Sequence, residues 1–243
     1  MPAKPKFSVI TVCFNCASMI ERTLKSVADQ TDADFEYIVV DGGSTDGTLD
    51  IIKRHSNTIS NLVSEPDRGI YDAMNKGVKL ASGDLVIFMN AGDTFASSDT
   101  LSKISASAEP DATVIYGDVI KTDSSGNEFI KKAEKPHNSH RMFFCHQSSL
   151  TSRKALLKHQ FDLVHPYSAD FKLIKQLYRQ GAKFQQLEFP IARFDSSGVS
   201  NTKRSTALAD NLKVLRETDT FFSLIKLSPR LIIPLIISKL RGK

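Results

Sequence analysis

FSVITVCFN, residues 7–15, followed by FEYIVVD, residues 35–41, is the stretch that decides the expected fold. The first run is apolar enough for a buried strand, and the second is rich in β-branched residues that favour strands. Between them, Ile20, Leu24 and Val27 recur at helical spacing. A strand, a helix and a second strand joined by short connections predict the first unit of an α/β sheet.

The same alternation continues outward to about residue 118. We expect further strands at 62–63, 85–89 and 113–116, with helices from about 45, at 70–80 and at 101–108. The run at 85–89 is continuously apolar, as in a strand buried on both faces, and is the expected central strand. Beyond residue 121 the pattern loosens into a polar hairpin-like stretch. It then resumes with a helix at 169–178, a strand at 184–189 and a helix at 206–217.

Four acidic residues each follow an apolar run: Asp41, Asp67, Asp93 and Asp118. In an open α/β sheet, ligands bind beyond the carboxyl ends of the strands, so acids at those ends are expected to converge. Converging carboxylates suit a hard divalent cation, which often shares its oxygen ligands with substrate phosphates. The pattern favours an enzyme that acts on a nucleotide-activated substrate.

Composition bounds the other possibilities. The chain has 243 residues, 41% hydrophobic and 24% charged, with a net charge of +5 and a pI near 9.0. This balance is compatible with a phosphorylated substrate or anionic lipid, but no basic stripe interleaved with aromatics indicates nucleic acid. Three cysteines and an N-terminus without a signal-peptide pattern favour a cytoplasmic protein.

The last 23 residues, FFSLIKLSPRLIIPLIISKLRGK at 221–243, mix apolar residues with cations and two prolines. The prolines make one long straight helix improbable, and no segment of the chain reaches the ~18 apolar residues of a spanning helix. Two interpretations stay open. The segment lies on the inner face of the plasma membrane as a peripheral contact, or it docks on the protein's own core.

FSVITVCFN, YIVVDGGSTDGT and EPDRGIYDAMNKGVKLASGDLVIFMNAGDTF, the last at residues 65–95, resemble the family 2 glycosyltransferases. The resemblance is close over the first half of the chain and loose over the second. It implies a GT-A fold with a mostly parallel sheet flanked by helices. It also implies one catalytic domain at 1–220, with a nucleotide-sugar half at 1–118 and an acceptor half at 119–220, before the tail at 221–243.

The resemblance implies an inverting transfer of a sugar from a nucleoside diphosphate donor, UDP-linked in our expectation. The acceptor would be a saccharide or lipid-linked saccharide in bacterial surface polysaccharide biosynthesis. In this interpretation Asp41 binds the nucleoside, and Thr11 and Asn15 line the base. Gly42 and Gly43 let the backbone approach the ligand, although a plain turn is the alternative.

The resemblance also assigns Asp67, Arg68 and Lys76 to the donor site. A guanidinium can fork to two diphosphate oxygens, and a lysine can act as a point charge. Surface salt bridging is the alternative for both cations.

Asn90-Ala91-Gly92-Asp93 occupies the position of the family's D-x-D motif, whose acids bind Mn²⁺ or Mg²⁺. Asn90 replaces the first acid, so Asp93 is the expected metal ligand and Asn90 a donor-side residue. This departure puts a strict need for metal in doubt.

In the second half the resemblance assigns Asp170 as the general base for the acceptor hydroxyl, with a helix-start acid as the alternative. It assigns His146 to acceptor binding, although a lone histidine is more often structural. The loop Ser196–Ser200 could close over the diphosphate.

Two other function classes compete with transfer. The asparagine at 90 and the basic apolar tail are also compatible with a catalytically inactive nucleotide-binding protein that assembles at a membrane surface. Cys13 and Cys16 form C-x-x-C between a strand and a helix, which leaves a thioredoxin-like role open, but core residues are the favoured interpretation.

Overall fold

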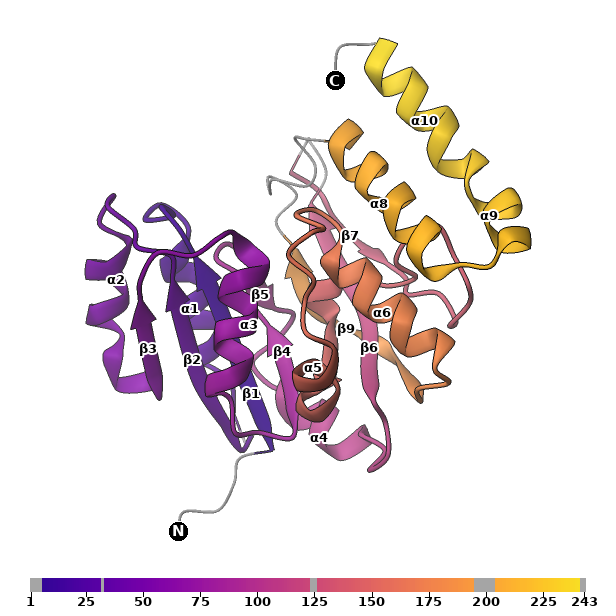
Figure 1. Cartoon of the computed structure of the whole chain (residues 1–243). Helices are drawn as coiled ribbons and strands as arrows, with labels where there is room; N and C mark the ends of the chain where they lie inside the picture. Colours follow the sequence, from indigo (N-terminus) through magenta and orange to yellow (C-terminus); the bar gives the residue numbers. More distant parts are fainter. Residues whose placement is uncertain (1–5, 32, 123–125, 195–203, 241–243) are drawn as a thin grey trace.

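The computed structural model describes residues 6–31, 33–122, 126–194 and 204–240, with backbone only for Arg204, Lys239 and Leu240. These residues form one nine-stranded sheet with helices on both faces (Figure 1). The strands are β1 Phe7–Cys13, β2 Phe35–Asp41, β3 Asn61–Ser64, β4 Leu85–Phe88, β5 Thr94–Phe95, β6 Val114–Thr122, β7 Glu128–Lys131, β8 Ser149–Ser152 and β9 Phe184–Phe194.

The first half of the sheet is parallel. The strand order is β3-β2-β1-β4-β8-β6-β9-β5, with β7 paired to β6, and the four strands from β3 to β4 run in the same direction. β1 is central among these four, because it pairs with β2 on one side and with β4 on the other. The carboxyl ends of all four strands therefore meet at one edge of the sheet.

The second half departs from the parallel pattern. β8 runs antiparallel to β4 and to β6, and β9 is parallel to β6 but antiparallel to β5. The sheet is therefore mixed, with an all-parallel first half and a second half that combines antiparallel pairs with the parallel β6–β9 pair.

The expectation that a strand ends before Asp118 is wrong. β6 continues past Asp118 to Thr122 and forms a hairpin with β7. The Asp118 carboxylate is buried in that hairpin, where it accepts from Lys132 Nζ at 2.8 Å and from the Ala133 amide at 3.0 Å. A β-bulge next to Gly117 lets the strand continue instead of ending.

The helices are α1 Ile20–Ala28, α2 Thr48–Arg54, α3 Ile70–Leu80, α4 Thr100–Ser107, α5 Arg153–His159, α6 Ala169–Arg179, α8 Arg204–Thr218, α9 Phe221–Leu227 and α10 Pro229–Leu240, with short 3₁₀ turns η1 Ser56–Thr58 and η2 His146–Ser148. Two cores lie on the two faces of the sheet. Val9 packs with α1 and α4 on one face, whereas its neighbour Ile10 packs with α3, α5 and α6 on the other. This alternation follows from the period of two in a strand.

The three C-terminal helices form a separate apolar cluster against α6. Leu227 of α9 and Leu231 of α10 are buried with Val214 and Leu215 of α8. Among the described residues, no single helix has the length and apolarity to cross a membrane. α9 and residues 229–238 of α10 pass that criterion only as a pair, bent by 43° at Ser228.

Candidate active site

The turn after β2 is built around the Asp41 carboxylate. Asp41 is 0% exposed, and its Oδ2 accepts from Ser64 Oγ at 2.7 Å and from the amides of Ser44 and Gly43 at 3.1 and 3.2 Å. Its Oδ1 accepts from Ser44 Oγ. Burial alone would raise the pKa of Asp41, but these hydrogen bonds outweigh it and leave the pKa lowered. Asp41 is therefore an ionised group whose acceptor capacity is largely used to shape the turn.

The turn presents a second carboxylate, that of Asp67, to the open side. A β-carbon on Gly42 would lie 2.4 Å from Asp67 Oδ2, so the missing side chain at position 42 is what admits this carboxylate. Asp67 Oδ1 accepts from the Gly69 amide at 2.8 Å, which orients the group. Asp67 is half-buried, and it is the acid of this turn that retains exposed surface.

Asn15 and Thr11, both expected to line the base, occupy different environments. Asn15 is exposed at the end of β1 with φ 45°, and its Oδ1 accepts from the Thr45 amide at 2.9 Å. Thr11 is 0% exposed and hydrogen-bonds to Tyr37 OH at 2.8 Å and to the Met89 carbonyl at 2.7 Å. Thr11 therefore has no exposed surface that could contact a nucleobase. Its hydrogen bonds connect β1 to β2 and to the residue that follows β4.

The two cations expected at the diphosphate differ in freedom. The Arg68 side chain is 78% exposed and its Nη2 lies 3.3 Å from Asp72 Oδ1, one helical turn on. Lys76 is held at 2.8 Å by both the Pro66 carbonyl and Glu65 Oε1. Lys76 therefore supports the 65–66 loop, whereas an exposed ion pair such as that of Arg68 is weak, about 0–1 kcal/mol, and can be exchanged for a ligand.

The Asn90–Asp93 turn lies on the other side of β1. The Ala91 amide donates to the Val12 carbonyl at 3.3 Å, and Thr23 of α1 holds the turn through the Gly92 amide and the Asp93 carbonyl. Asp93 is 4% exposed. Asn90 Oδ1 is buried and has no hydrogen-bond partner among the described residues, so an amide oxygen beside a carboxylate remains available as a ligand.

Asp170 lies in the first turn of α6, where it accepts from the Tyr71 hydroxyl at 2.8 Å. Burial, followed by the charge of Asp170, raises the pKa of Tyr71 well above its ordinary value of 10.0, so this phenol stays protonated and donates. The contact joins α3, which follows the Asp67 turn, to the second half of the chain.

His146 lies beside the end of β4. Its ring stacks on Phe88 with centroids 5.5 Å apart and meets Phe161 edge-on at 5.9 Å. Burial lowers the pKa of His146, and the charge of Asp170 opposes that change only in part. A neutral imidazole is therefore the expected form near pH 7, in electrostatic reach of Asp170.

The two sides of the site also meet at Cys145. Burial raises the pKa of the Cys145 thiol to about 11, and the nearby Asp93 carboxylate adds to the rise. His146 stacks on Phe88, two residues before Asn90, which places the 145–146 segment beside the Asn90–Asp93 turn. The strand order places Asp67, Asn90 and Asp93 after the ends of parallel strands at one edge of the sheet. The contacts of Tyr71 with Asp170 and of Phe88 with His146 bring the second half of the chain to the same edge, whereas Thr11 lies in the core.

Sequence analysis missed Tyr71 and Ser64. Tyr71 is a nearly buried tyrosine within GIYDAMNKG, and a buried phenol requires a hydrogen-bond partner, which was the available signal. Ser64 carries no such signal, because its contact to Asp41 depends on the pairing of β2 with β3. The expected loop at Ser196–Ser200 lies outside the described residues.

Cys13 and Cys16 are buried free thiols. A hydrogen bond to Cys16, together with burial, raises the pKa of Cys13 far above its ordinary value. The same hydrogen bond lowers the pKa of Cys16, but both sulfurs are buried, at 7% and 8% exposure, and this inaccessibility supports a core role over a thioredoxin-like one.

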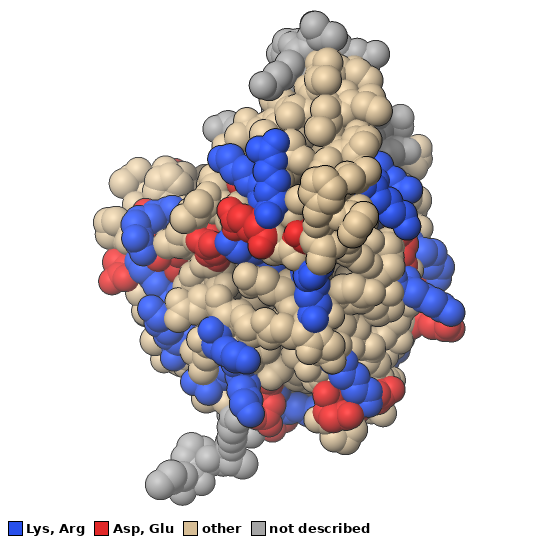
Figure 2. Space-filling view, turned by 45° about the vertical axis from the view of Figure 1, so that its right-hand side comes forward, with Lys and Arg blue, Asp and Glu red and all other residues tan. Residues whose placement is uncertain are grey.

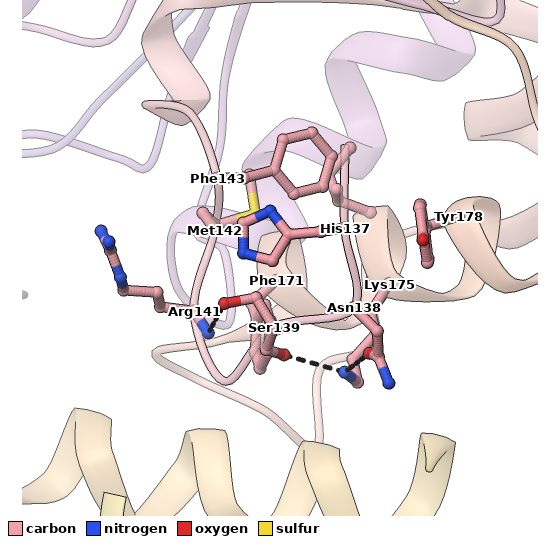
Figure 3. A pocket seen from close by; sticks show the side chains of 10 residues that line it. His137, Asn138, Ser139, Arg141, Met142, Phe143, Phe171, Lys175 and Tyr178 are labelled. Carbon is pink, nitrogen blue, oxygen red and sulfur yellow. Dashed lines mark hydrogen bonds between the residues drawn. The ribbon is translucent and has the colours of Figure 1, made fainter. Parts of the chain in front are cut away.

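Two hollows lie away from this edge. One, of about 670 Å³, is at the opposite end of the sheet, where β1 and β4 begin, and its lining includes Lys6, Asp84 and Arg153. The other, in Figure 3, has a volume of about 10 Å³, room for one water, between the 137–143 segment and α6. Neither adjoins the strand ends that carry the acids.

Asp162, His165 and Glu217 form an acidic cluster of a size that suits a metal ion. Lys172 Nζ, however, lies 2.6 Å from Asp162 Oδ2 and 2.5 Å from Glu217 Oε2, so an ammonium already neutralises these carboxylates. His165 is 0% exposed, and its two ring nitrogens lie at 2.9 and 3.0 Å from Asp210 and Glu217. The cluster is a polar joint between the start of α6 and α8.

Solved structures share this architecture. S. aureus TarS in complex with UDP matches with a TM-score of 0.68 at 21% identity, over 88% of this chain and 67% of that one. The mannosyltransferase PcManGT from Pyrobaculum calidifontis, in complex with GDP-Man and Mn²⁺, matches with a TM-score of 0.68 at 19% identity, over 89% of this chain and 64% of that one. The fold is that of a GT-A glycosyltransferase.

Sequence comparisons identify the family. The profile described as Glycosyl transferase family 2 matches residues 8–178. A "PGL/p-HBAD biosynthesis glycosyltransferase" of Mycobacterium tuberculosis is 35% identical over 185 residues, covering 71% of this chain and 67% of the relative. The chain belongs to glycosyl transferase family 2 and is a glycosyltransferase, and it spans about two thirds of the length of these relatives.

Proposed function

We propose that this chain is an inverting glycosyltransferase that moves a sugar from a UDP-linked donor to a saccharide or lipid-linked saccharide. The observation that carries the proposal is the gathering of Asp67, Asn90, Asp93 and Asp170 around one edge of the sheet. TarS is solved in complex with UDP, which supports a uridine donor, and a relative named for PGL/p-HBAD biosynthesis supports a glycolipid product.

On the donor side, Asp67 binds the nucleoside, and Asp41 supports Asp67 by holding the turn after β2. A carboxylate can accept from a base N–H or a ribose hydroxyl, and Asp67 Oδ2 is the oxygen aligned over Gly42. Asp41 fixes the turn that holds Asp67 at this position. Arg68 exchanges its exposed contact with Asp72 for the diphosphate.

A divalent cation, Mn²⁺ or Mg²⁺, fits the Asn90–Asp93 turn. Both ions favour oxygen ligands, and the turn offers the Asp93 carboxylate together with Asn90 Oδ1. Of these two groups, it is the buried Asn90 Oδ1 that has no hydrogen-bond partner among the described residues. When bound, such an ion stabilises negative charge on a diphosphate leaving group. Asp93 and Asn90 would hold it.

On the acceptor side, Asp170 takes the proton of the acceptor hydroxyl. As the hydroxyl oxygen forms its bond to the anomeric carbon, the bond from that carbon to the diphosphate oxygen breaks, and the nucleoside diphosphate leaves with the electron pair. Tyr71 orients the carboxylate through Oδ1 and leaves Oδ2 to act as the base. His146, neutral and stacked on Phe88, donates to or accepts from a sugar hydroxyl.

The test is turnover of a UDP-sugar panel with Mn²⁺ in the wild type and in Asp170→Asn and Asp93→Ala. Loss of a general base typically costs about 10²–10⁴-fold in rate, so we expect at least a hundredfold loss for Asp170→Asn with UDP binding retained. Asp93→Ala should lose Mn²⁺-dependent UDP binding as well. Asp111→Asn, on an acid that is 71% exposed, is the matched control. Undiminished transfer in both site variants would overturn the proposal.

A further inference from the structure

The outer face of α9 and α10 is apolar and uncovered. The inner face of α10 packs on α8 through Leu231, which is 1% exposed. On the opposite face Ile232, Ile233, Ile236 and Ile237 are 37–59% exposed, and in α9 Phe221 and Phe222 are 72% and 82% exposed. A contiguous exposed apolar face of this kind marks a contact surface for protein or lipid, so we infer that this face has an occupant.

The charge of the C-terminal segment indicates what covers this apolar face. Residues 220–243 contain five cations and no carboxylate. Among them Lys226 and Arg230 are exposed in the helices that carry the apolar face. Two copies of the chain joined through this face would oppose like charges, whereas anionic lipid supplies the opposite charge together with an apolar interior.

The placement of the helices fits this occupant. Figure 1 shows α10 outside α8, with its C-terminal end directed toward the edge at which β1–β4 end. In the space-filling view the described residues of the projecting upper part form an uncharged surface, and Lys and Arg side chains lie just below it, beside a smaller group of Asp and Glu (Figure 2). A bilayer along α9 and α10 would therefore lie at the same end of the molecule as Asp93 and Asp170.

We propose that α9 and α10 dock this protein in the interface of an anionic membrane, with the bent pair lying in the headgroup region. Resting on the proposed glycosyl transfer, this places the reaction next to a lipid-linked acceptor held in that membrane. The apolar side chains enter the acyl boundary while Lys226 and Arg230 stay with the phosphates.

The experiment uses the full chain and its lack of tryptophan, which makes any introduced tryptophan a single reporter. Phe222→Trp places the reporter on the proposed face, and Phe129→Trp places it at a 49% exposed site on β7. Each is mixed with vesicles of phosphatidylcholine alone or of equal parts phosphatidylcholine and phosphatidylglycerol, with brominated acyl chains as quenchers. We expect a blue shift and quenching for Trp at 222 with anionic vesicles, and neither for Trp at 129.

Charge placed on the face provides the second arm. Ile233→Glu with Ile236→Glu should lower partitioning onto anionic vesicles by at least about tenfold, because each carboxylate must enter the apolar boundary. Ile130→Glu, at 51% exposure on β7, should leave partitioning unchanged. An unquenched reporter at 222, equal partitioning of the glutamate variant, or a vesicle-free dimer that the glutamates disperse would overturn the docking surface.

Titration with UDP separates this proposal from the proposed function. UDP binding without vesicle binding overturns the docking surface and leaves the donor site intact. Vesicle binding without UDP binding supports the docking surface and contradicts the donor site.

Discussion

A missing β-carbon at position 42 determines which carboxylate the donor turn offers. Asp41 is consumed by its own turn, while Asp67 Oδ2 occupies the space that a side chain at 42 would fill. The proposed donor binding thus depends on a contact between residues 25 positions apart, a separation at which sequence periodicity carries no information.

Gly42→Ala is therefore predicted to act through Asp67. The new methyl would lie 2.4 Å from Asp67 Oδ2 and displace that side chain. We expect Gly42→Ala and Asp67→Ala each to weaken UDP binding about tenfold or more, and the double variant to lose no more than either single one. Calorimetric titration with UDP measures this cycle, and additive losses would show that the two positions act independently.

Tyr71 is the side chain that orients Asp170, whose Oδ1 accepts from the Tyr71 hydroxyl and from the Phe171 amide, each at 2.8 Å. Tyr71→Phe removes one hydrogen bond to a charged group, about 1.5–3 kcal/mol, which corresponds to about a ten- to hundredfold lower kcat. UDP affinity should be unchanged, because the Tyr71 phenol contacts the proposed general base Asp170 and not the turn that carries Asp67. Tyr178→Phe, on a partly buried tyrosine of α6, is the control. A change in donor KM with kcat preserved would contradict a positioning role.

Among the elements, α6 connects the site to the C-terminal helices. Its Lys175, 4% exposed, pairs with Asp219 at 2.8 Å after α8 and donates to the Ser139 carbonyl at 2.9 Å (Figure 3). Removing one partner of a buried ion pair typically costs about 3–5 kcal/mol. We expect that loss in the free energy of unfolding for Asp219→Ala, measured by urea titration. Asp99→Ala, from a pair whose partners are 47% and 53% exposed, should cost under about 1 kcal/mol. Equal losses would refute a structural role for the pair.

The joint between α6 and α8 also predicts acid sensitivity. Hydrogen bonds from Lys172 lower the pKa values of Glu217 and Asp162 below their ordinary 4.5 and 3.8. Stability from such groups is present above the unfolded pKa and is lost as pH falls through the folded one. The urea concentration at the unfolding midpoint should therefore decrease as the pH is lowered below about 4.5. Lys172→Met should flatten that decline by up to about 1 kcal/mol, because both carboxylates are about 40% exposed. If Lys172→Met lost stability at low pH as steeply as the wild type, the ion pairs of Lys172 would not be the source of the acid sensitivity.

The elements divide by how they could be predicted. β1, β2, β4 and α3 follow from apolar runs and helical spacing, and their strand-end acids followed with them. β8 and β5 did not, because SLTS and TF, with four and two residues, are too short to show an apolar run or an alternation, and they are strands through pairing with their neighbours. The strand end predicted before Asp118 was wrong because pairing with β7 and β9 extends β6 past that point.

At the scale of the whole molecule, a parallel half carries the proposed donor site, a mixed half carries the proposed base Asp170, and an apolar pair of helices lies beyond them. Sequence motifs predicted the first half closely, because donor residues lie in short local segments. The acceptor side and the order of its strands depend on long-range pairing, so Asp170 was predicted without its partner Tyr71.

The most direct test of the central claim is a crystal structure of the protein with UDP and Mn²⁺. We expect an anomalous manganese peak beside Asn90 Oδ1 and Asp93, and the uracil or ribose at Asp67. The diphosphate should lie between the manganese ion and Asp67. A nucleotide or manganese peak elsewhere, such as in the 670 Å³ cavity where β1 and β4 begin, would contradict it.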